Sequence, residues 1–408
     1  MTWKTHLRNG VLIAIVAVIG IVWYLFTPDK ARVPLSDVQG LQPSLQKERP
    51  EAFPTIKIAE IVGWKGDART AADRLDHPRN IHVLPNGDVL VAESTQPARE
   101  TKGLTDWIAR KLILEANGSR LSANRITLLR DADRNGVPEE RHVLLTGLNS
   151  PFGMQYLDGK LYVANTDALM GFPYSLGQTR IDAKGEKLLA LPASLPNNHW
   201  TRNIAATPDG KRLLIAIGSN SNIGENGMKS EEGRAEIREY TIETRRSLTY
   251  AYGLRNPVGL DFHPVNGLPW TVVNERDMLG SDGPPDYLTS VDFGTFYGWP
   301  YTYWGRYRDD RVKQDRPDLL QYTKIPNYAL GGHVAPIGLV FSRGETLGAQ
   351  FANGAFIALH GSWNRYPASG YEVVFVPFNE RGFPTGAKPV QVVGGFLVRF
   401  APQTAAAP

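Results

Sequence analysis

The chain has 408 residues, among them 40 glycines, 29 prolines and no cysteine, and its formal net charge is +4. The lack of cysteine excludes disulfide bonds and thiolate chemistry. So small a charge, without a long basic run beyond the N-terminus, argues against a nucleic-acid partner. A chain of this length can bury a core without covalent cross-links, and its glycine and proline content favours many short strands joined by turns.

The first predicted element is a transmembrane helix over residues 10–27. Its apolar run VLIAIVAVIGIVWYLF carries no charge, and a helix of this length, at about 1.5 Å per residue, nearly spans a hydrocarbon core of roughly 30 Å. Trp23 and Tyr24 lie where interfacial aromatic residues gather. A cleaved signal peptide is the alternative, but no small-residue cleavage site follows in TPDKARVPL.

The residues that flank this helix indicate its orientation. Lys4 and Arg8 lie in the N-terminal residues 1–9, and positive residues favour the cytoplasmic side. We therefore expect a single-pass protein of the inner (plasma) membrane, with its body on the periplasmic side. Residues 28–54 are rich in proline, glutamine and charge, which is typical of a linker.

The body of the chain, residues 55–408, repeats one pattern. A small or polar turn precedes an alternating apolar strand, a glycine-containing turn and a second apolar strand. The five copies cover residues 77–94, 150–166, 201–219, 256–275 and 335–362. Hairpins with Asn-Gly and Asp-Gly turns at such periods predict the blades of a β-propeller. A β-sandwich with coincidental hairpins is the alternative, and five matched copies argue against it.

A sixth copy of the pattern is missing from the sequence. After VQVVGGFLVRF the chain runs into APQTAAAP. A closed propeller is expected either to end on a further copy or to take a strand from the N-terminal part of the body. We therefore predict that the last blade is incomplete.

Several motifs give the body a resemblance to a known family. They are HWTRNIAATPDGKRLLIAIGS, AYGLRNPVGLDFHP, YGWP, HVAPIGLVF and LHGSWNR. Over roughly residues 60–396 their order resembles that of the PQQ-dependent sugar dehydrogenases, which include soluble glucose dehydrogenase, aldose sugar dehydrogenase and sorbosone dehydrogenase-like proteins. The resemblance implies an all-β, six-bladed β-propeller with PQQ on its top face. It also implies oxidation of an aldose or sugar aldehyde to the lactone or acid, with electrons passed to a quinone or cytochrome.

Two residues match the catalytic pair of this family. His199 precedes a predicted inner strand and matches the general base, a task that suits histidine because its ordinary pKa lies near neutrality. Soluble glucose dehydrogenase has an acidic residue where this chain has Asn198. Arg255 matches the arginine that polarises the quinone carbonyl, since a guanidinium is always charged and offers several donors. A solvated loop histidine and a surface arginine are the alternatives.

Further residues are candidates for binding the cofactor, whose three carboxylates require positive charge. Asn256 matches a neighbouring cofactor contact of the family. His360 stands near the place of a lysine in soluble glucose dehydrogenase, and Arg365 is expected to compensate for the weaker charge of a histidine. Trp363 either stacks on the ring of PQQ or packs between blades.

The resemblance also implies Ca²⁺, held by main-chain carbonyls of the loop after the Arg255 blade. The matching loop is VNERDMLGSDGPPDY, and its candidate ligands are the carbonyls of Asp277 and Met278. The loop is acidic enough for a hard cation, but Arg276 and Asp277 replace the family's usual small residues. A solvated loop without metal is the alternative.

A second calcium candidate lies in DADRNGVPEE, at Asp131, Asp133 and Asn135. The spacing imitates the start of an EF-hand loop, but the twelfth position is His142 instead of glutamate, which excludes a true EF-hand. A structural Ca²⁺ site and a plain turn are both compatible with this pattern.

Two other functions compete with sugar oxidation. A Ca²⁺-dependent propeller lactonase would activate water on an axial metal, and it has no need of Arg255 beside His199. A non-catalytic, degenerate propeller would bind sugar or protein partners. The missing sixth copy and the altered residues at 198, 276 and 360 favour this option. The oligomeric state is left open.

Overall fold

The computed structural model describes residues 56–57, 75–97, 122–134, 136, 138–313, 316–345, 347–365 and 367–394. The predicted cytoplasmic N-terminus, transmembrane segment and linker lie outside these residues. No helix within the described part of the chain is long and apolar enough to cross a membrane.

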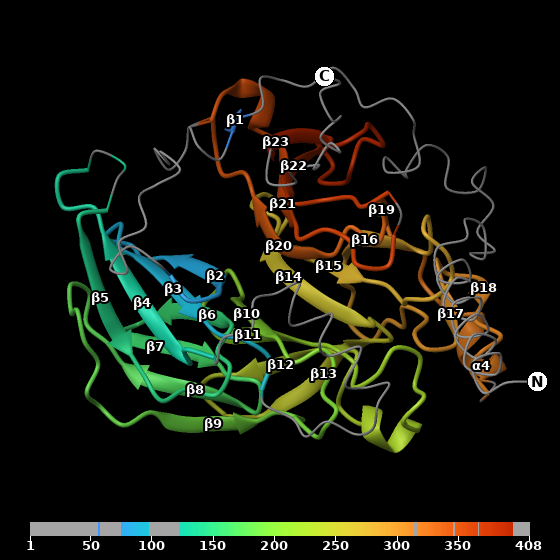
Figure 1. Ribbon diagram of the computed structural model, residues 1–408, viewed down its shortest axis with the longest axis horizontal. Coiled ribbons are helices and arrows are strands. Elements are labelled where there is room, and N and C mark those ends of the chain that lie inside the picture. The colour runs from blue at the N-terminus through green and yellow to red at the C-terminus, as the bar shows by residue number, and fades with distance from the viewer. Residues whose placement is uncertain are drawn as a thin grey trace, which may run out of the picture.

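The described residues form an all-β propeller of five blades, each a meander of antiparallel strands (Figure 1). Blade 1 contains β2 (Pro78–Val83), β3 (Val89–Glu93), β4 (Arg125–Arg130) and β5 (Glu140–Leu145). Blade 2 contains β6 (Gly153–Leu157), β7 (Lys160–Ala164), β8 (Ala168–Pro173) and β9 (Glu186–Ala190). Blade 3 contains β10 (Arg202–Ala206), β11 (Arg212–Ile217), β12 (Glu236–Thr241) and β13 (Ser247–Tyr252).

The two remaining blades carry the additions to this plan. Blade 4 contains β14 (Asn256–Phe262), β15 (Pro269–Asn274), β16 (Pro285–Ser290) and β19 (Tyr328–Gly332). Its insertion holds β17 (Thr302–Tyr303), β18 (Tyr307–Arg308) and α4 (Pro317–Leu320). Blade 5 contains β20 (Pro336–Phe341), β21 (Gly354–Leu359), β22 (Glu372–Pro377) and β23 (Val390–Gly394). Two 3₁₀ turns, Met228–Glu231 and Ala349–Phe351, lie in loops.

The five hairpins predicted from the repeat are the first two strands of the five blades, in the predicted order. The β6–β7 turn illustrates why the sequence folds this way. Asp158 and Gly159 connect the two strands with φ angles of 46° and 75°, and positive values at both positions are the signature of a type I′ turn.

Blade 5 has a fifth strand from the N-terminal part of the body. β1 (Ile56–Lys57) pairs in parallel with β23 at the outer edge of this blade. A strand from the N-terminal part of the body was one of the two arrangements expected for a closed propeller, and here it extends the fifth blade. The sixth blade that the resemblance implies is not formed by the described residues.

Glycines without a Cβ, and one asparagine side chain, allow neighbouring blades to approach closely. A Cβ on Gly153 would lie 2.6 Å from the backbone nitrogen of Ile204, and one on Gly259 would lie 2.7 Å from that of Leu339. These glycines therefore let β6 contact β10 and β14 contact β20. Asn203 Nδ2 donates to the Val258 carbonyl at 2.8 Å, which ties blade 3 to blade 4.

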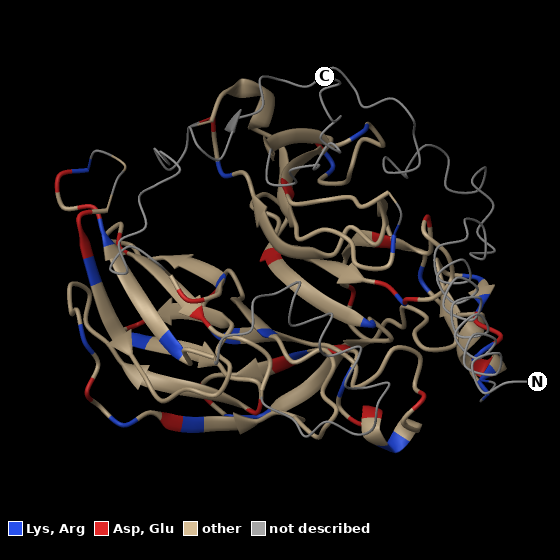
Figure 2. Ribbon diagram, in the orientation of Figure 1, with Lys and Arg blue, Asp and Glu red and all other residues tan. Residues whose placement is uncertain are grey.

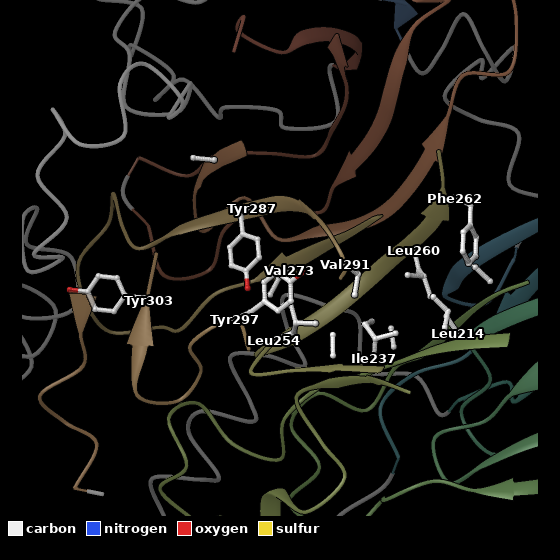
Figure 3. Close-up of a cluster of buried hydrophobic side chains, with 14 of the residues drawn as sticks. Leu214, Ile237, Leu254, Leu260, Phe262, Val273, Tyr287, Val291, Tyr297 and Tyr303 are labelled. Atoms are coloured by element: carbon white, nitrogen blue, oxygen red, sulfur yellow. The ribbon is translucent and has the colours of Figure 1, made fainter. Parts of the chain in front are cut away.

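The core lies between the blades, where apolar faces of adjacent sheets meet. Figure 3 shows the cluster that includes Leu214 and Ile237 of blade 3 with Leu260 and Val273 of blade 4. Burying each such side chain contributes roughly 1.5–3 kcal/mol. This packing fixes the blades relative to one another and so fixes the loops that their strands carry.

Candidate active site

The predicted catalytic residues lie in loops at one end of the blades. In an antiparallel hairpin, the start of the first strand and the end of the second lie side by side. His199 precedes β10 and Ser219 follows β11, whereas Arg255 precedes β14 and Asp277 follows β15. The contacts between blades 3 and 4 therefore bring these four residues together. Figure 2 shows acidic and basic residues adjoining along the chain just after β15.

His199 is held in one tautomer by Ser219. Its Nδ1 lies 3.0 Å from the Ser219 carbonyl and 2.8 Å from the Ser219 hydroxyl oxygen. That hydroxyl donates its proton to the Ser221 carbonyl at 2.6 Å, so both Ser219 groups accept from Nδ1–H. The lone pair of neutral His199 therefore lies on Nε2.

The surroundings of His199 keep its ring neutral. Burial is the main cause that holds the pKa of His199 well below its ordinary value, and the positive charge of Arg255 lowers this pKa further. The Asp277 carboxylate opposes both effects. Asn198 carries no negative charge, and Asp277 supplies one that acts on His199.

Arg255 is buried at the centre of a hydrogen-bond network. Its Nη1 donates to the carbonyls of Asn274 (3.3 Å) and Glu275 (2.6 Å), and its Nε donates to the Asn222 carbonyl (3.1 Å). Its Nη2 lies 2.8 Å from both Asn222 Oδ1 and Asp277 Oδ2. Each of its five N–H donors has a partner, so the guanidinium is fixed in place beside His199.

Asp277 links Arg255 to a histidine that sequence reasoning did not single out. Asp277 Oδ1 lies 3.6 Å from Nδ1 of His333, whose Nε2 lies 2.8 Å from the Gly280 carbonyl. Burial alone would raise the pKa of Asp277, but Arg255 and His333 outweigh burial and lower it to about 2. The pKa of His333 is raised, because Asp277 outweighs its burial. The signal in the sequence was the histidine that opens HVAPIGLVF.

The predicted carbonyl ligands for Ca²⁺ are occupied by a cation of the chain itself. Arg311 Nη1 donates to the carbonyl of Asp277 at 2.9 Å and to that of Met278 at 3.3 Å. Arg276 points elsewhere, because it is fully buried against Glu275 and Asp309. A divalent cation would meet the Arg311 guanidinium, so these carbonyls do not fit Ca²⁺ in this arrangement.

The second calcium candidate gathers three carboxylates. Asp131, Asp133 and Glu139 each offer an oxygen within 4.8 Å of the others. Asn135 lies outside the described residues. The backbone nitrogens of Gly136 and Ala132 donate to Asp131 and Glu139, respectively, as in a turn closed by acidic side chains.

Asn256 carries a buried polar atom that suits a ligand. Its Oδ1 is buried without a hydrogen-bond partner among the described residues. A Cβ on Gly218 would lie 2.4 Å from this oxygen and 2.5 Å from the Cβ of His199, so the glycine is what allows the two side chains to lie this close. An unpaired buried amide oxygen costs free energy unless a donor satisfies it, and PQQ, which carries an N–H group, fits this requirement.

The remaining candidates follow β21 in blade 5. Burial, followed by the charge of Arg79, lowers the pKa of His360, so this side chain is a weak counter-ion. Arg365 donates to the Ser281 carbonyl at 2.9 Å and pairs with Asp282. Trp363 has 63% of its surface exposed; it does not pack between blades, and stacking on a ligand is the alternative that its exposure permits.

Comparison with known proteins places this geometry in a family. The chain matches the TrAA12-like family over residues 61–285 and 310–393. It is 30% identical over 244 residues to an uncharacterized protein of Borreliella burgdorferi, a match over 57% of this chain and 63% of that protein. It is 27% identical over 223 residues to a pyrroloquinoline quinone-dependent pyranose dehydrogenase of Coprinopsis cinerea, over 44% of this chain and 30% of that protein. The chain thus spans less than two thirds of the length of both relatives.

Two further likenesses agree with this result. The chain is 23% identical over 370 residues to a pyrroloquinoline quinone-dependent sugar dehydrogenase of Hypocrea jecorina, over 79% of this chain and 76% of that protein. The calcium structure of a Trichoderma reesei enzyme of family AA12 superposes with a TM-score of 0.61 at 20% identity, over 78% of this chain and 84% of that chain; this likeness shows the fold. The chain therefore belongs to the TrAA12-like family and is a homologue of the PQQ-dependent sugar dehydrogenases.

Proposed function

We propose that this protein is a PQQ-dependent dehydrogenase that oxidises an aldose or sugar aldehyde to the lactone or acid. The observation that carries this proposal is the tautomer of His199. Ser219 accepts a hydrogen bond from Nδ1–H, so the lone pair of Nε2 can act as a base. Such a neutral imidazole can accept the proton of a sugar hydroxyl at neutral pH. PQQ, when bound, would supply the acceptor for the two electrons.

The residues around His199 are suited to the change of charge in this reaction. Proton transfer turns His199 into an imidazolium, which the Asp277 carboxylate stabilises and the Arg255 guanidinium opposes. The ion pair between Arg255 and Asp277 keeps both groups at fixed positions. Asn256, with its unpaired Oδ1 next to His199, is the residue that we expect to contact the cofactor.

Ca²⁺ has no step in this mechanism, because Arg311 occupies the carbonyls of Asp277 and Met278. The same observation disfavours a Ca²⁺-dependent lactonase with its metal at this loop. A lactonase would also leave Arg255, beside His199, without a role.

The proposal is tested by titration of the purified full-length protein with PQQ, followed by absorbance and by heat. Binding must then support reduction of an electron-accepting dye by aldoses. Absence of both a cofactor spectrum and binding heat would overturn the proposal. If PQQ binds and no aldose or sugar aldehyde reduces the dye, the protein is a binding propeller instead of a dehydrogenase.

Two further parts of the proposal, the membrane anchor and the electron acceptor, rest on the sequence alone. We infer from the apolar run within residues 10–27, and from Lys4 and Arg8 before it, that the protein is anchored in the inner membrane with its body on the periplasmic side. A membrane quinone or a cytochrome is then the proposed electron acceptor. Membrane fractionation, and reduction of a soluble quinone by the loaded enzyme with sugar, test these two parts.

A further inference from the structure

Arg79 is a half-buried cation whose guanidinium has no anionic partner among the described residues. It lies in β2, the inner strand of blade 1. Its Nε is buried and has no hydrogen-bond partner, and no ion pair joins its guanidinium to any carboxylate among the described residues. Its guanidinium lies over the ring of Trp200, whose centre is 5.2 Å from Cζ.

The other buried arginines at this end of the blades each have hydrogen-bond or ion-pair partners for their Nη atoms, although Nε of Arg202, like that of Arg79, has none among the described residues. Arg202 donates to four oxygens, Arg255 is paired with Asp277, and Arg276 is paired with Glu275 and Asp309. A buried charge without a partner is costly, and burial lowers the pKa of Arg79. A guanidinium with its Nε buried and without an anionic partner among the described residues is suited to binding an anion.

One contact and one electrostatic effect locate Arg79 relative to the candidate active site. Trp200, which stacks against its guanidinium, directly follows His199 in the sequence. The charge of Arg79 also acts on His360, in the loop after β21. Arg79 therefore lies near the loop of His199 and close enough to His360, in the blade 5 loop, for their charges to interact.

None of the cations predicted from the sequence to bind the cofactor is well suited to pair with its carboxylates. Arg365 is neutralised by Asp282, and Arg255 is neutralised by Asp277. His360 is a poor counter-ion, because its pKa is lowered. A cofactor with several carboxylates still requires a positive group, and an arginine with a free edge suits a carboxylate because its N–H donors match both oxygens.

We propose that Arg79 is a cofactor-binding residue, which pairs with a carboxylate of PQQ while its other face stacks on Trp200. This inference rests on the proposed function, since it assigns a residue to the same site. The carboxylate of an acid product is the other anion of this chemistry, and the experiment separates the two.

The test compares the wild-type protein with Arg79→Gln, Arg79→Lys and the control Arg180→Gln, which changes an exposed arginine. The dissociation constant of PQQ is measured by titration calorimetry without sugar. We expect binding to weaken about tenfold or more in Arg79→Gln, because a charge-assisted hydrogen bond is lost. Arg79→Lys should recover part of the affinity, and Arg180→Gln should bind as the wild type does.

A second titration uses the trimethyl ester of PQQ, which lacks the carboxylate charges. The wild-type protein should prefer PQQ over the ester by a wider margin than Arg79→Gln does. An altered fold would weaken both ligands alike, and that outcome would contradict the proposal. Unchanged PQQ affinity in Arg79→Gln, with weaker inhibition by a sugar acid, would assign Arg79 to the product instead. If the wild-type protein does not bind PQQ, the proposed function fails first and this inference fails with it.

Discussion

Nη2 of Arg255 lies 2.8 Å from Oδ2 of Asp277, and the two charges act on His199 in opposite directions. Burial and then the guanidinium lower the pKa of His199, whereas the carboxylate raises it. The two members of the ion pair therefore have opposing effects on the pKa of His199.

Replacement of the base, His199→Ala, should lower kcat by about 100- to 10,000-fold, the usual contribution of general base catalysis. The affinity for PQQ should change little, because the imidazole acts on the substrate. Dye reduction and PQQ titration measure the two effects, and His142→Ala, on blade 1, serves as the control. Equal loss of binding and turnover would show that His199 is structural.

The pH profile of kcat/KM should report a low pKa for His199. Burial and Arg255 hold this pKa well below 6.5, so activity should be flat near neutrality and fall only on the acid side of pH 6.5. Asp277→Asn removes the carboxylate that opposes these effects, and the acid limb should move to still lower pH. An acid limb centred above pH 6.5 would contradict this electrostatic account.

Asp286 should make the protein less stable as the pH rises. Its carboxyl accepts from the backbone nitrogens of Glu275 and Ala335, and burial raises its pKa from 3.8 to about 7. Between these values the folded state binds more protons than the unfolded state, so the free energy of unfolding falls with pH, by up to about 4 kcal/mol. Urea denaturation at pH 5 and pH 8 should show this slope in the wild type and lose it in Asp286→Asn; Asp182→Asn, at an exposed site, should keep it.

Gly218→Ala should damage the site without removing the fold. The new Cβ would lie 2.4 Å from Asn256 Oδ1 and 2.5 Å from the Cβ of His199, so one of these side chains must move. We expect a loss of about 1–3 kcal/mol of stability and a larger relative loss of turnover, measured by denaturation and dye reduction. Gly338→Ala, where the nearest atom is the Cβ of Ala358 at 3.3 Å, is the matched control. Wild-type turnover in Gly218→Ala would show that this crowding is unimportant.

Removal of divalent cations should leave PQQ affinity unchanged. The reason is that Arg311 donates to the Asp277 and Met278 carbonyls, where a bound Ca²⁺ would be repelled. Titration calorimetry before and after treatment with a chelator tests this expectation. A large fall in affinity, restored by Ca²⁺, would mean that Arg311 leaves these carbonyls when the cofactor binds.

The repeat alone determined the propeller. Alternating apolar residues and Asn-Gly or Asp-Gly turns are local signals, because the pleat and the turn angles depend on neighbouring residues in the chain. The hairpin that contains Asp158 and Gly159 lies within the predicted copy 150–166, with its turn at the Asp-Gly pair. The resemblance likewise selected His199, Arg255 and Asn256, which the structure brings to one end of the blades.

The partners of these residues could be found only from the tertiary structure. Ser219 fixes the tautomer of His199, Asp277 contributes a negative charge that acts on His199, and Arg311 occupies the predicted calcium ligands. The sequence did not distinguish Arg79 from other cations, and only the fold shows that its Nε is buried without a hydrogen-bond partner among the described residues. Such contacts join loops of different blades, and their pKa shifts depend on burial and on distances between charges, which residue order along the chain does not set.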